Sequence, residues 1–587
     1  MKVFFRFFRD YPRESILAPL FKLLEACFDL LVPLVVARII DIGILGGDGT
    51  GDSGYVWKMT AVLVLLAFVG LACAVTAQYF SAKAAVGTAT RLRHDLFAHM
   101  QSFTYAQTDK VGTSSMITRM TSDINQVQSG INMTLRLTLR SPIIVFGAMI
   151  MAFTIDTRLA CIFAAAIPVL AAVVFGIMLG GIPLYRRVQA KLDQVTAATR
   201  ENLNGVRVIR AFNKEAEQVQ HFDTVNGEQT GLQNKAGRLS ALMNPLTYVL
   251  VNMAVVLLIR QGGFAVNTGR ITQGEVVALV NYMAQILVEL VKLANTVFLV
   301  TKAVACSNRV GAVLDMPAGM SVIPDGEGRP VPADADADTA VPRVAFDRVS
   351  LTYGEGGGPA LSDVTFAAYP GETVGIIGGT GSGKTTLVNL IPRLYEATEG
   401  TVSVMGRDVR CQDPAALRAH IGIVPQKAEL FKGTVRSNLL WGDGTANDET
   451  LWQALEDAQA ADFIRSKEGQ LDAPVEQRGR NFSGGQRQRL TIARALVGRP
   501  DILILDDSAS ALDFATDARL RKTLRALPYH PTTFIISQRT SSIRACDRIL
   551  VLDDGHVVGM GTHESLLAGC ETYREIHESQ YKGGDEA

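Results

Sequence analysis

VGIIGGTGSGKTTLVNL, at residues 374–390, is the stretch that decides the fold of the C-terminal half of the chain. Its apolar start predicts a buried strand, and its glycines carry the spacing G-x-x-x-x-G-K-T at residues 378–385. The segment that follows has the composition of a helix. Glycines allow backbone N–H groups to close around phosphates, and the N-terminus of a helix adds partial positive charge. The stretch therefore predicts a phosphate-binding loop between a strand and a helix.

Two side chains of this loop have specific expected roles. Lys384 is expected to reach the β- and γ-phosphates of a nucleotide, and the hydroxyl of Thr385 is expected to bind Mg²⁺. The candidate nucleotide-binding residues of the loop are Gly378, Gly379, Thr380, Gly381, Ser382, Gly383, Lys384, Thr385 and Thr386.

Further nucleotide-site signals surround the loop. Tyr353 is placed upstream to stack on an adenine, although alone it could equally be an aromatic residue of a strand. Gln426, in IVPQKAEL, is placed to meet the metal and the attacking water, although in isolation it would be a surface amide. Asp506 ends the apolar run DILILD and would hold Mg²⁺ through water. A second phosphate-binding nest is expected where FSGGQRQR (482–489) opens a helix, formed by Ser483, Gly484, Gly485 and Gln486.

The N-terminal half is apolar enough to cross a membrane. Apolar residues make up 48% of the chain and charged residues only 19%. A bilayer core needs about 20 apolar residues in a helix, a length that buried helices of soluble proteins rarely reach. Six spans are predicted, at residues 16–44, 59–82, 136–155, 159–185, 239–259 and 276–302. The N-terminal segment and the long stretches after spans two and four are basic, so the positive-inside rule places both termini and these stretches in the cytosol.

The last predicted span has a polar stripe. At 100° per residue its polar residues fall within an arc of about 120°. A charge facing lipid costs about 2.5–3.5 kcal/mol, so the stripe must face protein or water. It either lines a substrate cavity or reflects a Glu289–Lys292 pair with interhelical hydrogen bonds. The candidate cavity residues are Asn281, Gln285, Glu289, Lys292 and Asn295, and the first span has a weaker stripe of Lys22, Glu25 and Asp29.

The order of these motifs closely resembles an ATP-binding cassette (ABC) transporter. In that family the loop at 378–385 is Walker A, Asp506 is the Walker B acid, "SGGQ" is the signature, and SALD (510–513) is the D-loop. With the preceding spans, the chain looks like an exporter half-transporter in a bacterial cytoplasmic membrane. The resemblance implies an all-α six-helix transmembrane domain (1–315), a linker (316–342), an α/β P-loop ATPase domain (343–580) and a tail (581–587). It also implies ATP and Mg²⁺ as cofactors, and coupling helices near residues 114–127 and 205–215.

The sequence departs from the family pattern at two positions. Asp507 stands where members that hydrolyse ATP at both sites place glutamate, and Gln538 stands where they place the switch histidine. Asp is one methylene shorter than Glu, and Gln does not titrate near neutral pH. The phosphate-binding residues are complete, so we expect this site to hold ATP and hydrolyse it poorly. The family contains heterodimers in which one of the two ATP sites has lost its catalytic residues. By this resemblance, the chain is predicted to pair with a non-identical half-transporter. The signature residues of this chain would then complete the active site on the partner's Walker motifs.

Two other functions fit the same motifs. A homodimeric exporter would tolerate both substitutions with slow turnover, and a regulatory membrane ATPase would signal without moving a substrate. Soluble chromosome-maintenance ATPases share the signature but lack membrane spans.

The formal net charge of zero gives no basis for nucleic-acid binding, and the seven scattered cysteines indicate neither a disulfide framework nor a zinc site. The polar stripe suits small amphiphilic drugs, lipids or peptides alike.

Overall fold

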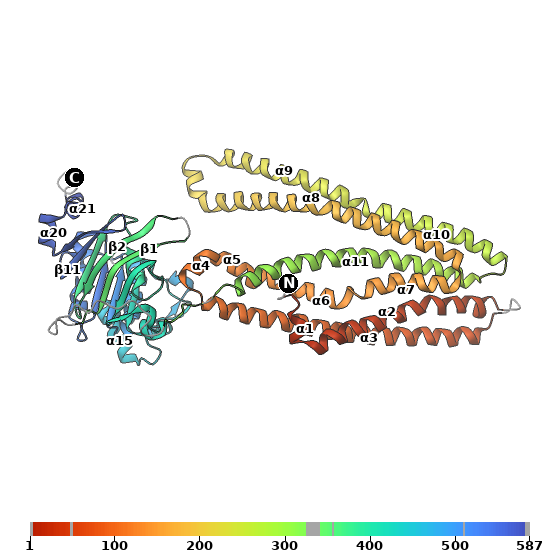
Figure 1. The fold of residues 1–587 in the computed structure, drawn as a ribbon, viewed down its shortest axis with the longest axis horizontal. Helices are drawn as coiled ribbons and strands as arrows, with labels where there is room; N and C mark the ends of the chain where they lie inside the picture. The colour runs from red at the N-terminus through yellow and green to blue at the C-terminus, as the bar shows by residue number, and fades with distance from the viewer. Residues whose placement is uncertain are drawn as a thin grey trace. The chain divides into compact units, whose positions relative to one another are not determined.

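The computed structural model describes residues 4–46, 51–317, 319–323, 341–354, 357–508 and 511–581. Contacts divide the chain into two compact units. The first comprises Met1–Gln101 and Thr113–Pro317, and the second comprises Ser102–Gly112 and Ala318–Ala587. The first unit is helical and the second holds the described strands (Figure 1). Most of the predicted linker at 316–342 and of the predicted tail at 581–587 lies outside the described residues.

The first unit is a bundle of long helices. Its main elements are α2 (Pro12–Arg38), α3 (Ser53–Gln101), α6 (Ile124–Leu137), α7 (Arg140–Ile155), α8 (Thr157–Ala211), α9 (Glu215–Ala241), α10 (Met243–Asn267) and α11 (Gln273–Leu314). Helix α11 packs against α2, α6, α7 and α10, while α9 and α10 run alongside α8 (Figure 1). Buried side chains of α2, α7, α8, α10 and α11 form one apolar core, which includes Ala26, Ala148 and Phe163.

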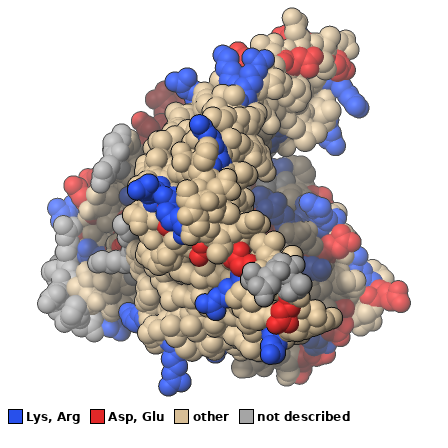
Figure 2. Space-filling model, turned by 90° about the vertical axis from the view of Figure 1, so that its right-hand side faces the viewer, with Lys and Arg blue, Asp and Glu red and all other residues tan. Residues whose placement is uncertain are grey.

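Five stretches of the described residues are long and apolar enough to cross a membrane. They are Ser53–Gln101, Thr113–Ile155, Thr157–Ala211, Glu215–Asn267 and Gln273–Leu314. The first predicted span corresponds to α2, which carries the three charged residues Lys22, Glu25 and Asp29 among its apolar residues, and its crossing stays a prediction. On the face of this unit seen in Figure 2, acidic and basic residues are scattered across a mostly uncharged surface.

The long polar stretches between spans are helical extensions rather than loops. Helix α8 has 55 residues, which at 1.5 Å per residue is about 80 Å, well beyond the thickness of a bilayer core. It ends at Ala211, and α9 begins at Glu215 after a turn in which Asn213 has a φ of 51°. The segment predicted as a coupling helix at 205–215 is therefore a helix end and a tight turn.

A short helix, α4 (Tyr105–Val111), belongs to the second unit although its flanking helices belong to the first. Thr104 and Gln107 form a capping box at its start, which explains why a helix of only 7 residues is held in shape. The predicted coupling segment at 114–127 instead forms α5 (Thr113–Thr118), a π-helical turn and the start of α6, all within the first unit. The coupling role of this segment stays a prediction.

The second unit is built on a six-stranded sheet of order β12-β11-β3-β10-β9-β6. Strands β3 (Thr373–Gly378), β6 (Ile421–Val424), β9 (Ile502–Asp506), β10 (Thr532–Ile536) and β11 (Arg548–Asp553) run parallel, and β12 (His556–Gly561) is antiparallel. A second, antiparallel sheet contains β1 (Val344–Thr352), β2 (Pro359–Ala368), β4 (Glu399–Val404) and β5 (Arg407–Asp408). Ile536 pairs with both Ile376 and Asp506, so the carboxyl ends of β3, β10 and β9 share one edge.

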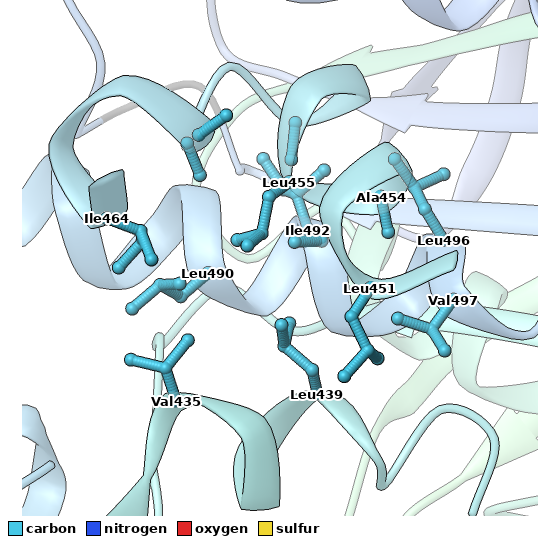
Figure 3. Close-up of a cluster of buried hydrophobic side chains, with 14 of the residues drawn as sticks. Val435, Leu439, Leu451, Ala454, Leu455, Ile464, Leu490, Ile492, Leu496 and Val497 are labelled. Atoms are coloured by element: carbon cyan, nitrogen blue, oxygen red, sulfur yellow. The ribbon is translucent and has the colours of Figure 1, made fainter. Parts of the chain in front are cut away.

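The helical part of the second unit has its own apolar core. Helix α17 (Gly484–Val497) buries Leu490, Ile492 and Leu496 against α14 (Val435–Leu439), α15 (Asp448–Asp457) and α16 (Ala461–Arg465) (Figure 3). This packing fixes the helix that begins at the predicted signature.

Candidate functional site

The phosphate-binding loop joins β3 to α12 (Lys384–Leu390), as the sequence predicts. Gly383 caps this helix with a φ of 93°, and a Cβ there would lie 2.6 Å from the carbonyl oxygen of Ala360. Only glycine meets both conditions without strain. The ammonium of Lys384 donates hydrogen bonds to the carbonyls of Gly378 (2.9 Å) and Gly379 (2.5 Å). Burial lowers the pKa of Lys384, against the opposing attraction of nearby acids.

The predicted Mg²⁺ ligands Thr385 and Asp506 lie next to each other. The Thr385 hydroxyl lies 3.0 and 3.1 Å from the two carboxylate oxygens of Asp506. Asp506 is 6% exposed at the end of a fully buried strand, and burial raises its pKa while the bond from Thr385 lowers it. Gln426 is exposed two residues beyond β6, the strand next to β9. Oxygen donors converging on one sheet edge suit a hard cation such as Mg²⁺.

Asp507 follows directly on the same edge. Its φ is 46°, a left-handed conformation that Asp tolerates better than most residues. Its backbone N–H donates to the carbonyl of Ile536 at 3.0 Å, which ties it to the neighbouring strand.

Gln538 lies two residues beyond β10 and its side chain is exposed. Helix α21 (Glu571–Tyr581) holds the backbone around it. The Gln580 amide donates to the carbonyl of Gln538 (2.7 Å), and its oxygen accepts from the N–H (2.9 Å) and the hydroxyl (3.0 Å) of Thr540. Nothing in the local pattern of the sequence pointed to Gln580, because α21 follows the switch by some thirty residues and has no motif of its own.

Tyr353, the candidate for adenine stacking, is 43% exposed and donates to the hydroxyl of Thr386 at 3.0 Å. Its ring meets the edge of Tyr395 at 5.1 Å between centroids. Tyr395 in turn donates to Asp109 of α4 at 2.8 Å, and burial together with that carboxylate raises the pKa of Tyr395. A chain of contacts therefore leads from α4 to the phosphate loop. No motif in the sequence connects Tyr395 and Asp109, so neither residue was predicted.

The signature residues open α17. Ser483 and Gln486 form a capping box, in which the Gln486 N–H donates to the Ser483 hydroxyl (3.3 Å) and the Ser483 N–H donates to the Gln486 side chain (3.0 Å). Ser483 and Gly484 are exposed and Gly485 is half-buried. The D-loop residue Ser510 lies outside the described residues, while Asp513 caps α18 (Phe514–Arg525).

The polar stripe of α11 borders a cavity of about 500 Å³ in the first unit. The polar residues that line it are Asp29, Arg140, Asn281, Gln285, Glu289 and Lys292. Asn295 is exposed and is not among them. The Glu289–Lys292 pair is present at 3.0 Å. That the cavity receives a substrate stays a prediction. Arg140, which bonds Glu289 at 2.7 Å, was missed because it lies 149 residues away in the sequence.

Comparisons with known proteins assign both units. Residues 15–290 match the family described as ABC transporter transmembrane region, and residues 361–510 match the family described as ABC transporter. An uncharacterised ABC transporter ATP-binding protein of Mycobacterium tuberculosis is 36% identical over 575 residues, covering 97% of each chain. The ATP-dependent lipid A-core flippase of Syntrophus aciditrophicus is 31% identical over 499 residues, covering 84% of this chain and 80% of the flippase.

The same fold occurs in a solved structure, a bacterial Atm1-family ABC exporter with ATP bound. Its TM-score is 0.79 at 24% identity, and the match covers 98% of this chain and 99% of that one. The chain belongs to the ABC transporter family, as an exporter half-transporter in which a helical transmembrane domain is fused to an ATP-binding domain.

Proposed function

We propose that this ATP-driven exporter chain is one subunit of a heterodimer, and that the ATP site on its own Walker motifs binds ATP but hydrolyses it slowly. The observation that carries the proposal is that Asp507 and Gln538, the two departures from the family pattern, lie at one edge of the sheet. Asp506, just before Asp507, pairs with Ile536, two residues before Gln538. Both changes therefore affect the same reacting region.

The chemistry expected there follows from the side chains. An Asp carboxylate ends one methylene short of a Glu carboxylate, and a misplacement of about 1 Å can cost on the order of 10²-fold in rate. Gln538 cannot take up or release a proton near neutral pH, so it cannot replace a histidine that responds to the γ-phosphate. Gly378–Thr385 and Asp506 retain the residue types that the family pattern expects at the phosphates and the metal, which supports ATP binding without fast hydrolysis.

Thr385, Asp506 and Gln426 would hold Mg²⁺ in this site. When bound, the ion supplies charge neutralisation at the phosphates. The chain itself contributes the cation of Lys384, the backbone amides of the loop, and the stacking face of Tyr353. The signature, Ser483 to Gln486, would complete the site of the partner chain, whose own Walker motifs would supply the glutamate and histidine. Most hydrolysis would then occur at that second site.

We place the exporter in a bacterial cytoplasmic membrane, with both termini and the ATPase domain in the cytosol, because the basic residues concentrate in the predicted cytosolic segments. A small amphiphilic molecule, a drug, lipid or peptide, is the proposed cargo. The cavity beside α11 supports this, since it combines charged and apolar walls. The flippase similarity is to a lipid transporter and is compatible with such a cargo.

The test is ATP turnover by the purified full-length chain in nanodiscs, alone and together with a half-transporter encoded next to it that has Asp-Glu after its Walker B strand and a switch histidine. The chain alone should bind ATP and turn it over about 10²-fold more slowly than the pair. Brisk turnover by the isolated chain would instead indicate a homodimeric exporter. ATP-dependent uptake into vesicles by the pair would exclude a regulatory ATPase that moves no substrate.

A further inference from the structure

Four charged side chains in the helical unit form one continuous chain of ion pairs. Arg140 of α7 bonds Asp29 of α2 at 2.8 Å and Glu289 of α11 at 2.7 Å. Lys292, one turn along α11, bonds the same oxygen of Glu289 at 3.0 Å. The order Asp29–Arg140–Glu289–Lys292 alternates in sign, and it joins three helices that the sequence separates widely.

The middle of this chain is buried and paired. The side chains of Glu289 and Arg140 are 5% and 12% exposed. Both carboxylate oxygens of Glu289 accept hydrogen bonds, one from Arg140 and Lys292 and the other from the Ser141 hydroxyl at 2.8 Å. Buried charges persist only when they are paired in this way, so the central pair is structural.

The two ends are different. The side chains of Asp29 and Lys292 are 41% and 46% exposed, and both line the cavity of about 500 Å³. One wall of the cavity therefore offers a carboxylate and an ammonium, held apart by the buried pair. Gln285 also lines this cavity, and its amide oxygen is buried with no hydrogen-bond partner within the described part of the chain.

The remaining walls are apolar, with Val32, Ile144 and Val288 among them. The volume lies in the usual range for small-molecule sites. A ligand with a single charge would pair with only one end of the ion-pair chain, Asp29 or Lys292. The other end would then face a like charge or have no ligand charge to pair with. A ligand with both charges compensates both ends.

Resting on the proposed transport function, we propose that the cavity selects amphiphiles with a zwitterionic head group, whose cation pairs with Asp29 and whose anion pairs with Lys292. The apolar tail lies against the aliphatic wall. The acid and the base at the ends thus set the substrate class, while Arg140 and Glu289 position them.

The experiment compares amphiphiles that share a dodecyl chain: dodecylphosphocholine, dodecyltrimethylammonium, dodecyl methyl phosphate and dodecyl maltoside. Binding is measured without ATP, from the unfolding temperature of the full-length protein in nanodiscs, with its partner chain present where one is required. Dodecylphosphocholine should bind about tenfold more tightly than the singly charged and uncharged probes.

Variants of the two ends separate the roles. Asp29→Asn should reduce zwitterion affinity to that of the anionic probe, and Lys292→Gln should reduce it to that of the cationic probe. Lys302→Gln, exposed on the same helix, and Asp223→Asn, exposed on α9, are the matched controls and should change nothing. Lys292→Arg keeps the charge and should keep the preference, which separates selection from a folding defect.

Equal binding of all probes, or end variants that behave like the controls, would overturn the inference. Because binding is read without hydrolysis, a failure here is distinct from a failure of the proposed function. Lost preference with intact ATP-dependent uptake contradicts only the substrate class. Retained preference without uptake contradicts transport instead.

Discussion

The backbone N–H of Asp507 donates to the carbonyl oxygen of Ile536 at 3.0 Å. This bond joins Asp507 to β10, the strand that ends two residues before Gln538. The two substitutions therefore lie on segments that are hydrogen-bonded to each other. We expect Asp507→Glu combined with Gln538→His to raise ATP turnover of the isolated chain by about 10²-fold, with each single change giving much less, because residues acting together are non-additive. Phosphate release measures the rate. ATP affinity serves as the control and should stay constant, and a double variant no faster than the parent would contradict the degenerate-site proposal.

The backbone geometry of the phosphate-binding loop leads to a prediction about Gly383. Gly383→Ala should lower the unfolding temperature without nucleotide, because alanine at a φ of 93° is strained by about 1–2 kcal/mol and its Cβ would lie 2.6 Å from a backbone oxygen. Gly379→Ala in the same loop is the matched control, since a Cβ there meets nothing within 4 Å. Equal shifts for both variants would show that the backbone there is not as rigid as described.

The clamp formed by Gln580 should be visible in amide exchange. Gln580→Ala removes the acceptor of the Thr540 N–H, a bond worth about 1 kcal/mol, so exchange at Thr540 should speed up about fivefold. Ser579→Ala is a suitable control, because within the described part of the chain the Ser579 hydroxyl bonds only to the Ile576 carbonyl of the same helix. Unchanged exchange in the first variant would mean that α21 does not hold the switch segment.

Tyr395→Phe tests the link that Tyr395 makes between α4 and Tyr353, the residue proposed to stack on adenine. The variant keeps the ring against Tyr353 and loses the hydrogen bond to Asp109, about 1 kcal/mol for a partly exposed pair. We expect transport per ATP hydrolysed to fall by up to about fivefold while ATP affinity is retained. Tyr185→Phe also removes a tyrosine hydroxyl bond, to Ser240 within the helical unit, and should leave this ratio intact.

A histidine at the C-terminal end gives a pH prediction. Burial, reinforced by His577 and Arg544, lowers the pKa of His563 below its usual 6.5, and the ring bonds the Tyr573 hydroxyl at 2.8 Å. The folded state then binds fewer protons than the unfolded state just below pH 6.5, so stability of the ATP-binding domain should rise with pH through that window and level off above it. His563→Gln should flatten the dependence in thermal unfolding, whereas exposed His556→Gln should not.

Local sequence patterns predicted those parts of the site that depend only on residues adjacent in the sequence. The loop at 378–385, the buried Asp506 and the capping serine of α17 follow from glycine spacing, an apolar run and a helix start, all of which are properties of neighbouring residues. The apolar spans were predicted for the same reason, through the length of uncharged sequence.

What the sequence did not predict depends on contacts between distant segments. Arg140 completes the charges of α2 and α11 only because three helices meet. Tyr395 and Gln580 act through residues far away in the chain. The assignment of residues 102–112 to the second unit likewise depends on packing rather than periodicity.

The ion-pair chain beside α11 also has a consequence for energetics in a living cell. With the adjoining Lys22–Glu25 pair, its acids and bases balance, as Lys22, Arg140 and Lys292 offset Glu25, Asp29 and Glu289. A transmembrane voltage does work on net charge alone, about 2.3 kcal/mol per elementary charge per 100 mV. A cavity without net charge that carries a zwitterion moves no net charge across the membrane. The rate of transport should therefore be the same in polarised and depolarised vesicles.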